Sequence, residues 1–192
     1  MEMTEDGVHQ DSRELLERLQ ELHLSAFTWS LHCCDGRRAE AEDVLQTVYL
    51  KLLTGSARFD GRSAFKTWVF AVIRSTSRDS RRSIGRRLRL LSTWLTGRTS
   101  AQEAAAPAIA YENELRESIG RLLSALSGRQ REILQLVFYH DLTIEQAAHV
   151  LGISVGSARV HYERGKDNLR RRLTPFKERY DRARRGANQA AV

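Results

Sequence analysis

Residues Asp141 to Leu173 read DLTIEQAAHVLGISVGSARVHYERGKDNLRRRL, and this stretch decides the fold of the C-terminal half of the chain. Thr143, followed three positions later by Gln146, has the pattern of a capping box and predicts the start of a helix. Gly152 comes directly after that helix, where a left-handed C′ position needs a residue without a Cβ. Ser154 predicts the cap of a second helix. The stretch therefore predicts two helices joined by a tight turn.

The apolar positions of both helices recur at helical spacing, which predicts that each helix buries one face. These positions are Ile144, Ala147, Ala148 and Leu151 in the first helix, Ile153 at the corner, and Val155, Ala158, Tyr162, Leu169 and Leu173 in the second. Two helices that cross steeply need a small side chain at the contact and a glycine in the turn. Ala148 and Gly152 meet both needs, so the pattern is typical of a helix-turn-helix.

The outward face of the second helix carries side chains suited to the major groove of DNA. Arginine pairs with guanine, glutamate accepts from the amino group of cytosine, and an apolar group contacts the methyl of thymine. The side chains on this face are Ser157, Arg159, Val160, Glu163, Arg164 and Lys166. A solvated face on a purely structural helix is the alternative, but the capping, the glycine and the basic charge together favour DNA reading.

The composition indicates a helical, basic protein. The chain has 192 residues, enough for one ordinary domain or two small ones, and 31 Lys and Arg against 24 Asp and Glu give a formal net charge of +7. This excess favours polyanionic partners. The 2 prolines and the scarcity of alternating β-branched residues predict an all-α fold. The polar N-terminus does not read as a signal peptide, and no apolar run is long enough to span a bilayer.

The two cysteines, Cys33 and Cys34, are adjacent and cannot form a relaxed disulfide with each other. A reducing cytoplasm is therefore the expected location. His32 beside them suggests a metal site, but consecutive residues cannot surround one ion, and no second cluster with metal-ligand spacing follows. We expect no metal site and no cofactor.

The N-terminal half is expected to begin with a disordered segment, residues 1–11, and to continue as helices. The first helix is expected over Ser12–His32, capped by Asp11 or Ser12. Its apolar side consists of Leu15, Leu16, Leu19, Leu22, Phe27 and Leu31. The second is expected over Ala39–Leu53. Its buried stripe consists of Val44, Leu45, Val48, Tyr49 and Leu52.

A polar loop with aromatic ends follows over Arg58–Trp68, and Ser63 is its expected cap for the next helix. That helix begins apolar and becomes rich in arginine. The arginines in question include Arg74, Arg78, Arg81 and Arg82. Cations interleaved with aromatic rings suit single-stranded nucleic acid, because the cations bind phosphates and the rings stack on bases. The alternative is that Phe59, Phe65 and Trp68 are ordinary core residues.

These two motifs resemble regions 2 and 4 of bacterial RNA polymerase sigma factors of the extracytoplasmic-function (ECF) group. Region 2 commonly reads AED-x-x-Q and then F-x-G-x-S-x-F-x-T-W. The matching positions here are Ala41, Glu42, Asp43, Gln46, Phe59, Gly61, Ser63, Phe65, Thr67 and Trp68. Region 4 commonly reads D-L-x-x-E-x-A-x-x-L-G-I-S-x-G. Its matches are Asp141, Leu142, Glu145, Ala148, Leu151, Gly152, Ile153, Ser154 and Gly156.

The resemblance implies a protein that binds core RNA polymerase and recognises promoter DNA at two elements. The positions implied for the single-stranded −10 element are Phe59, Asp60, Gly61, Arg62, Ser63, Phe65, Trp68, Arg74, Ser75, Arg78, Arg81 and Arg82. Those implied for the −35 duplex are Ser157, Arg159, Val160, His161, Glu163, Arg164 and Lys166. Those implied for the polymerase are Asp43, Gln46, Thr47 and Leu50. A pair of Glu163 with Arg159 or Lys166 is the structural alternative for Glu163.

The family also implies the boundaries and the partners. Region 2 is expected over 12–87, a linker over 88–110, region 4 over 111–175 and a basic, frayed tail over 176–192. Leu90, Leu91, Trp94 and Leu95 form an apolar cluster of unassigned role in the linker. Region 4 should hold a helix from Leu115 to Leu126, another over Arg129–Tyr139 capped by Ser127, and the helix-turn-helix. Pro175 is expected to interrupt its last helix.

Such proteins are commonly bound one to one by an anti-sigma factor and are otherwise monomeric; no small-molecule substrate is implied. Two other classes stay open. A helix-turn-helix regulator acting alone would need a sensory front domain, but the front half lacks the strand-helix alternation of a receiver. A nuclease would need paired carboxylates, and Asp43 with Glu40 or Glu42 is the nearest approach.

Overall fold

The protein is described by a computed structural model, which gives the backbone of residues 5–92 and 125–189 and the side chains of residues 13–83 and 125–174. The chain divides into two compact units, residues 1–104 and 105–192. All regular elements within the described ranges are helices, in agreement with the all-α prediction. None of these helices is long and apolar enough to cross a membrane.

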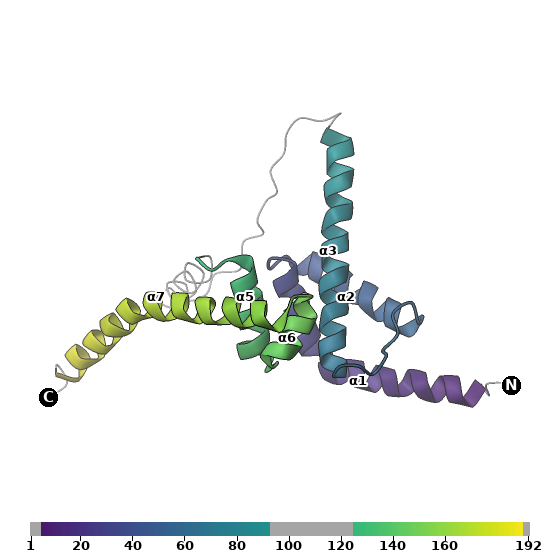
Figure 1. The fold of residues 1–192 in the computed structure, drawn as a ribbon, viewed down its shortest axis with the longest axis horizontal. Helices are drawn as coiled ribbons and strands as arrows, with labels where there is room; N and C mark the ends of the chain where they lie inside the picture. The colour runs from purple at the N-terminus through teal and green to yellow at the C-terminus, as the bar shows by residue number, and fades with distance from the viewer. Residues whose placement is uncertain (1–4, 93–124, 190–192) are drawn as a thin grey trace. The chain divides into compact units, whose positions relative to one another are not determined.

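The N-terminal unit consists of α1 (Glu5–Cys33), α2 (Arg38–Leu53) and α3 (Phe65–Ser92), each packed against the other two (Figure 1). Trp29 of α1 is fully buried and stacks on Phe70 of α3, with ring centroids 5.9 Å apart and planes 9° from parallel. Its Nε1 donates to the Phe70 carbonyl at 3.0 Å. Ser30 donates to the Ala41 carbonyl at 2.9 Å, which ties α1 to α2.

The prediction for α1 was wrong in its start and partly wrong in its buried face. The helix begins at Glu5 rather than Ser12, and acidic residues in its first turn suit the helix dipole. Leu16 is 44% exposed, whereas Ala26 and Trp29 are fully buried. A small residue such as Ala26, which lets a neighbouring helix approach closely, does not stand out in a hydropathy pattern. The predicted buried face was therefore centred on the leucines and left Ala26 out.

The predicted stripe of α2 is confirmed at Val44, Leu45, Val48 and Leu52, which are all buried. Tyr49 is half-buried, and its hydroxyl is hydrogen-bonded to Nδ1 of His23 at 3.0 Å. Burial raises the pKa of the Tyr49 phenol. The second helix therefore packs as its periodicity predicts, with one polar tie to α1 at the edge.

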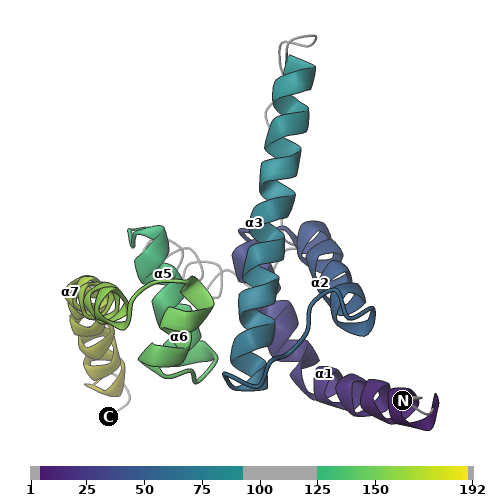
Figure 2. The ribbon, with the colours of Figure 1, turned by 45° about the vertical axis from the view of Figure 1, so that its right-hand side comes forward.

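α3 differs from its prediction at both ends. It begins at Phe65, and the Ser63 hydroxyl donates to the Ala64 carbonyl at 3.4 Å instead of capping the helix. It runs to Ser92, through Leu90 and Leu91, and its C-terminal half projects past α1 and α2 (Figure 2). Trp94 and Leu95 lie outside the described residues.

The C-terminal unit contains α5 (Gly128–Leu134), the π-helical segment η1 (Gln135–Tyr139), α6 (Ile144–Leu151) and α7 (Val155–Gln189). Ser127 caps α5, as predicted, and Gln130 completes a capping box that was not predicted. The predicted helix over Arg129–Tyr139 changes to a π-helix at Gln135, where the His140 amide donates to the Gln135 carbonyl at 3.2 Å. Most of the expected Leu115–Leu126 helix lies outside the described residues.

The prediction that Pro175 interrupts the last helix was wrong, since α7 continues through it to Gln189. A proline removes one helical hydrogen bond and can bend a helix without ending it, and α7 is visibly curved in Figure 1. The predicted buried face of α7 is confirmed at Ala158. It is wrong at the two ends, because Val155 and Leu173 are 37% and 43% exposed.

We predict that Gly165→Ala destabilises the C-terminal unit. Gly165 is buried in α7, and a Cβ there would lie 2.9 Å from Cδ1 of Leu134 and 3.3 Å from Cβ of Gln130. Overpacking costs about 1–3 kcal/mol, and the better helix propensity of alanine returns at most about 1 kcal/mol. The free energy of unfolding, measured by urea denaturation followed by circular dichroism, should fall.

Gly156→Ala is the matched control on the same helix. Gly156 is exposed, and the nearest atom to an added Cβ is Oγ of Ser154 at 4.0 Å. Its stability should not fall and can rise by at most about 1 kcal/mol, because only the better helix propensity of alanine acts there. Equal effects of the two substitutions would contradict the close α5–α7 contact.

Candidate nucleic-acid interface

The turn between α6 and α7 is built by hydrogen bonds that the sequence predicts. The Thr143 hydroxyl accepts from the Gln146 amide at 3.1 Å, and the Gln146 side chain accepts from the Thr143 amide at 2.9 Å. Gly152 has φ 61°, and the Ile153 amide donates to the Ala148 carbonyl at 3.1 Å. The Ser154 hydroxyl accepts from the Ser157 amide at 3.1 Å and begins α7. The predicted helix-turn-helix geometry is confirmed.

The outward side chains of α7 are accessible along the length needed to follow a groove. Five of them are exposed: Ser157, Arg159, Val160, Glu163 and Arg164. Val160 is 46% exposed although it is apolar. His161 and Lys166 are half-buried. An exposed apolar side chain between charged neighbours is suited to a thymine methyl, and the half-buried Lys166 and His161 at the edge are suited to phosphates, as a cation and a hydrogen-bond donor.

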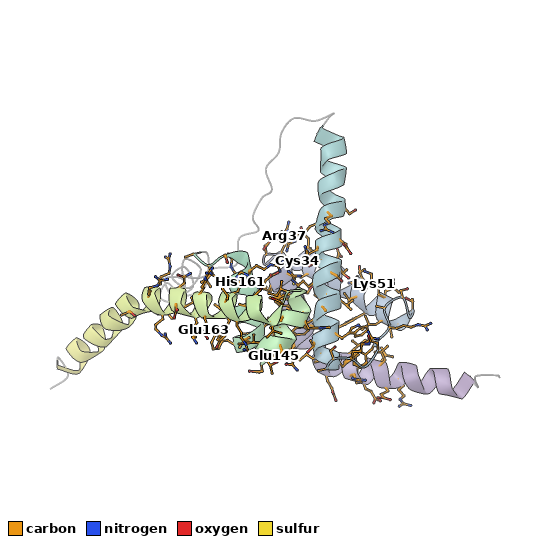
Figure 3. The ribbon with its side chains drawn as sticks, in the orientation of Figure 1. Cys34, Arg37, Lys51, Glu145, His161 and Glu163 are labelled. Atoms are coloured by element: carbon orange, nitrogen blue, oxygen red, sulfur yellow. The ribbon has the colours of Figure 1, made fainter. Side chains whose placement is uncertain are left out.

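Three of these charged side chains are already paired, in two ion pairs. Arg159 Nη2 lies 3.1 Å from Oε1 of Glu145 on α6, and Lys166 Nζ lies 2.8 Å from Oε2 of Glu163 one turn earlier on α7. The second pair is the structural alternative left open for Glu163. Figure 3 labels Glu145, His161 and Glu163 in this unit. Among the described residues, Arg164 makes no ion pair, so it is the free cation of the face.

These pairs shift two titrations in the directions expected of ion pairs. The pKa of Glu145 is lowered, first by a backbone hydrogen bond in the first turn of α6 and then by the hydrogen bond from Arg159. The pKa of Lys166 is raised by its hydrogen bond to Glu163. Both side chains are accessible to solvent, so the pairs orient the charges more than they stabilise the fold.

In the N-terminal unit, Phe59 of the α2–α3 loop joins Phe65 and Trp68 of α3 in an aromatic cluster. The ring centroids are 5.4 Å apart for Phe59–Phe65, 5.3 Å for Phe59–Trp68 and 5.9 Å for Phe65–Trp68. Phe65 is buried, and the other two rings are half-buried. The core alternative therefore holds for Phe65, whereas Phe59 and Trp68 keep part of their surface accessible.

The tip of the same loop is exposed and shaped by its own turn. Asp60, Gly61 and Arg62 are exposed, and Gly61 has φ 73°, which favours glycine. The Asp60 carboxylate accepts from the Arg62 amide at 3.1 Å. Ser63 is half-buried beside the tip. The predicted loop residues are thus brought together next to the aromatic cluster.

The arginines of α3 fall into two groups. Arg78, Arg81 and Arg82 are exposed, and Arg81 Nη1 lies 3.2 Å from the Asp35 carboxylate at the α1–α2 corner. Arg74, also predicted as a phosphate contact, is only 6% exposed and so is less accessible to a phosphate than the other three. Its face of α3 turns inward at that point. Ser75 is exposed, and its hydroxyl donates to the Val72 carbonyl at 2.9 Å.

The four positions predicted to meet the polymerase, Asp43, Gln46, Thr47 and Leu50, all lie exposed on α2. Their spacing places them on one side of the helix, opposite the buried stripe. Leu50 is 62% exposed and Leu53, one turn on, is 48% exposed. Two exposed leucines beside an acidic side chain form a surface suited to a protein partner.

Two contacts of these sites were not found by sequence reasoning. Arg18 of α1 lies over the Phe65 ring, with Cζ 3.9 Å from its centroid, and Glu145 lies against Arg159 from another helix. Nothing in the spacing of Arg18 signals its partner. Glu145 carried a signal, since it belongs to the motif of the first helix, but its role was not assigned.

Cys33 and Cys34 are buried thiols at the α1–α2 corner, where Figure 3 labels Cys34 and Arg37. Burial and the neighbouring Glu40 raise the pKa of the Cys34 thiol. Among the described residues, no three His, Cys, Asp or Glu side chains come together as a group able to hold a metal ion.

Comparison with known families finds two matches in sequence order. The family model for sigma-70 region 2 matches residues 21–87, and the model for sigma-70 region 4 matches residues 116–169. Together they cover more than half of the chain. The first match contains the α2–α3 loop with its aromatic cluster, and the second contains the helix-turn-helix.

Individual relatives agree with these models. The ECF RNA polymerase sigma factor SigX of Bacillus subtilis is 29% identical over 142 residues, which are 72% of this chain and 73% of that protein. The ECF RNA polymerase sigma factor SigD of Mycobacterium tuberculosis is 27% identical over 159 residues, which are 82% of this chain and 74% of that protein.

Two solved structures share the fold. The sigma factor RpoE, in complex with the anti-sigma factor NepR from Bartonella quintana, matches with a TM-score of 0.62 and 19% identity over 84% of this chain and 97% of that one. CnrH, in complex with the cytosolic domain of CnrY, matches with a TM-score of 0.57 and 20% identity over 86% of this chain and 94% of that one.

We predict that Arg159→Ala raises the pKa of Glu145 part of the way to its ordinary value. The substitution removes the hydrogen bond from the guanidinium but leaves the backbone bond, which is the larger cause of the lowered pKa. Because the pKa is depressed, the pair is present at neutral pH and is lost as the pH falls through that pKa. Carboxyl NMR titration of Glu145 in both proteins measures the shift.

Arg164→Ala is the control, since Arg164 lies on the same helix and makes no ion pair among the described residues. It should leave the Glu145 midpoint in place. An unchanged midpoint in Arg159→Ala would show that the pair does not form in solution.

Proposed function

This chain belongs to the sigma-70 family of RNA polymerase sigma factors, and we propose that it binds core RNA polymerase and directs it to promoters through −10 and −35 elements. The observation that carries the proposal is the order of the two matches, region 2 and then region 4, on two separate compact units. A regulator acting alone accounts for the helix-turn-helix but leaves the region 2 match unexplained. Sigma factors are generally not enzymes, and no catalytic role is proposed.

The C-terminal unit is proposed to read the −35 element as duplex DNA through α7. Arg159, Val160, Glu163 and Arg164 are the base-edge candidates, because they are exposed on the outward face. Ser157, His161 and Lys166 are the candidates for phosphate contacts. An arginine bidentate to guanine gives about 1–3 kcal/mol of discrimination against the wrong base. Arg159 and Glu163 must leave their present partners, Glu145 and Lys166, to contact base edges. Their contribution to the binding free energy therefore depends on which base is present.

The N-terminal unit is proposed to hold the −10 element as a single strand. Unstacking one base costs a few kcal/mol, so the strand must gain contacts that the duplex cannot make. The loop from Phe59 to Ser63 offers an exposed tip beside half-buried rings, where an extruded base can stack. Arg78, Arg81 and Arg82 extend along α3 from there and are suited to the phosphates. Ser75 occupies a position where family members commonly have Asn. The base that this protein prefers in the −10 element is therefore expected to differ from theirs.

The exposed side of α2 is proposed to bind the polymerase through Asp43, Gln46, Thr47 and Leu50. An anti-sigma factor is a further proposed partner, bound one to one, because the sigma factor RpoE, which shares the fold, was solved in complex with the anti-sigma factor NepR. A sigma factor acts where the chromosome and polymerase are, so we propose a cytoplasmic location.

Run-off transcription tests the proposal. The protein is mixed with core polymerase lacking any sigma factor and a library of random promoter sequences, and the transcripts are sequenced. We expect defined start sites that share two short motifs at constant spacing. Arg164→Ala should relax selection at one position of the upstream motif by roughly 5- to 150-fold and leave the downstream motif unchanged. Tight duplex binding without transcripts would favour a regulator acting alone.

Leu50→Ser is expected to weaken binding to core polymerase without changing the fold. Leu50 is 62% exposed, so the substitution removes no core contact. Burying such a leucine in an interface contributes about 1.5–3 kcal/mol, which corresponds to a loss of roughly 10- to 150-fold in affinity. Fluorescence anisotropy of the labelled protein against core polymerase measures the dissociation constant.

Leu173→Ser is the matched control, since Leu173 is an exposed leucine of the other unit at 43%. Its affinity should stay within a factor of two or so of wild type. Equal losses in both variants would mean that the exposed side of α2 is not the polymerase-binding face.

A further inference from the structure

Arg18 of α1 lies over two rings of the aromatic cluster in the N-terminal unit. Its Cζ atom lies 3.9 Å from the centroid of the Phe65 ring and 5.7 Å from that of the Phe59 ring. Phe59 belongs to the α2–α3 loop, Phe65 to α3 and Arg18 to α1. One guanidinium therefore joins three separate segments of the chain at the base of the loop.

The surroundings of Arg18 direct its charge to these rings. It is half-buried, and within residues 13–83 it makes no salt bridge, although acidic side chains occur on its own helix. Arg13, further toward the N-terminus of α1, is 85% exposed in its side chain and lies 3.7 Å from Glu17. A cation over an aromatic face is attracted more strongly when it is partly removed from water. Arg18 is in that position, whereas Arg13 is an ordinary surface residue.

The loop depends on the aromatic cluster for its attachment. Its tip is fixed internally, because the Asp60 carboxylate binds the Arg62 amide and pairs with the Arg62 side chain at 3.5 Å. Asp60, Gly61 and Arg62 are all exposed, so most of the surface of the tip faces solvent in the described part of the unit. Phe59 is the loop residue whose ring enters the cluster. The contacts that hold the Phe59 ring therefore also set the position of the tip, residues 60–62.

We propose that Arg18 is a positioning residue that holds the α2–α3 loop in place before the −10 strand arrives. The guanidinium lies close over the Phe65 ring and, at a longer distance, over the Phe59 ring, so the loop is tied to α1 as well as to α3. This inference rests on the proposed role of the loop in binding the −10 strand. A preformed loop loses less conformational freedom on binding, so the strand is captured faster than by a loose one.

Limited trypsin digestion of the full-length chain tests the attachment directly. Trypsin cleaves after Arg58 and Arg62, which lie on either side of Phe59. Cleavage needs a local opening of the loop, so its rate follows the population of the open form. In Arg18→Ala we expect the initial rates at these two bonds to rise about 3- to 30-fold, as measured by mass spectrometry. Arg13→Ala, the matched control on α1, should digest like wild type.

The functional arm uses the same variants with core polymerase. Open-complex formation, followed by the fluorescence of 2-aminopurine placed in the −10 element, should slow by about 3- to 30-fold in Arg18→Ala. Affinity for core polymerase and for −35 duplex should not change. Arg18→Lys should recover part of the rate, because the ammonium keeps the charge but loses the flat contact with the ring.

A double-mutant cycle separates positioning from a general loss of stability. Phe59→Leu removes one ring of the attachment, so it should reproduce the effect of Arg18→Ala, and the two together should add little. Additive effects, or digestion of Arg18→Ala at the wild-type rate, overturn the inference. If Arg18→Ala loses its helical circular dichroism, the comparison of Arg18→Lys with Arg13→Ala decides in its place.

The two levels of proposal fail differently. Wild-type protein that does not open any promoter with core polymerase contradicts the proposed function, whatever the digestion shows. Wild-type protein that opens promoters, with Arg18→Ala opening them equally fast, contradicts only the positioning role.

Discussion

The packing of Trp29 against Phe70 is the contact on which the N-terminal unit depends. The indole is fully buried, its ring stacks on Phe70, and its one donor is satisfied by a carbonyl of the same residue. A buried indole without that acceptor would cost free energy, so the bond fixes both the depth and the rotation of α1 against α3. This packing also positions the exposed side of α2 and the loop beside Arg18, because α1 contacts both α2 and α3.

The sequence was sufficient where local rules decide. Both capping boxes, at Ser127 and Thr143, are formed within four residues of chain, and the left-handed Gly152 is required by the turn itself. The buried stripe of α2 follows from its period. Such features need no knowledge of distant partners, which is why the helix-turn-helix and the order of helices could be predicted.

The sequence was insufficient where residues far apart meet. Arg18 is over 40 positions from Phe65, and no spacing rule links them. The burial of Arg74 depends on which side of α3 faces α1 and α2, not on the run of arginines in which it stands. Pro175 was interpreted as a break because proline ends many helices, yet α7 continues through it, as a helix can when it bends at a proline. Asp141, with φ 55°, occupies a left-handed position that a pattern of residue types does not reveal.

The charges on α7 carry a consequence for recognition. Arg159 is paired with Glu145 and Glu163 with Lys166, so the outward face presents fewer unpaired charges than its sequence indicates. A side chain that must first leave an internal ion pair gains little binding free energy from an arbitrary DNA sequence. It gains more from a sequence whose bases offer good partners to both members of the pair. Among the described residues Arg164 makes no ion pair, so it can bind a base without giving up an internal partner. Paired charges thus make a contact depend on the base offered, whereas the basic excess of the chain favours affinity for any DNA.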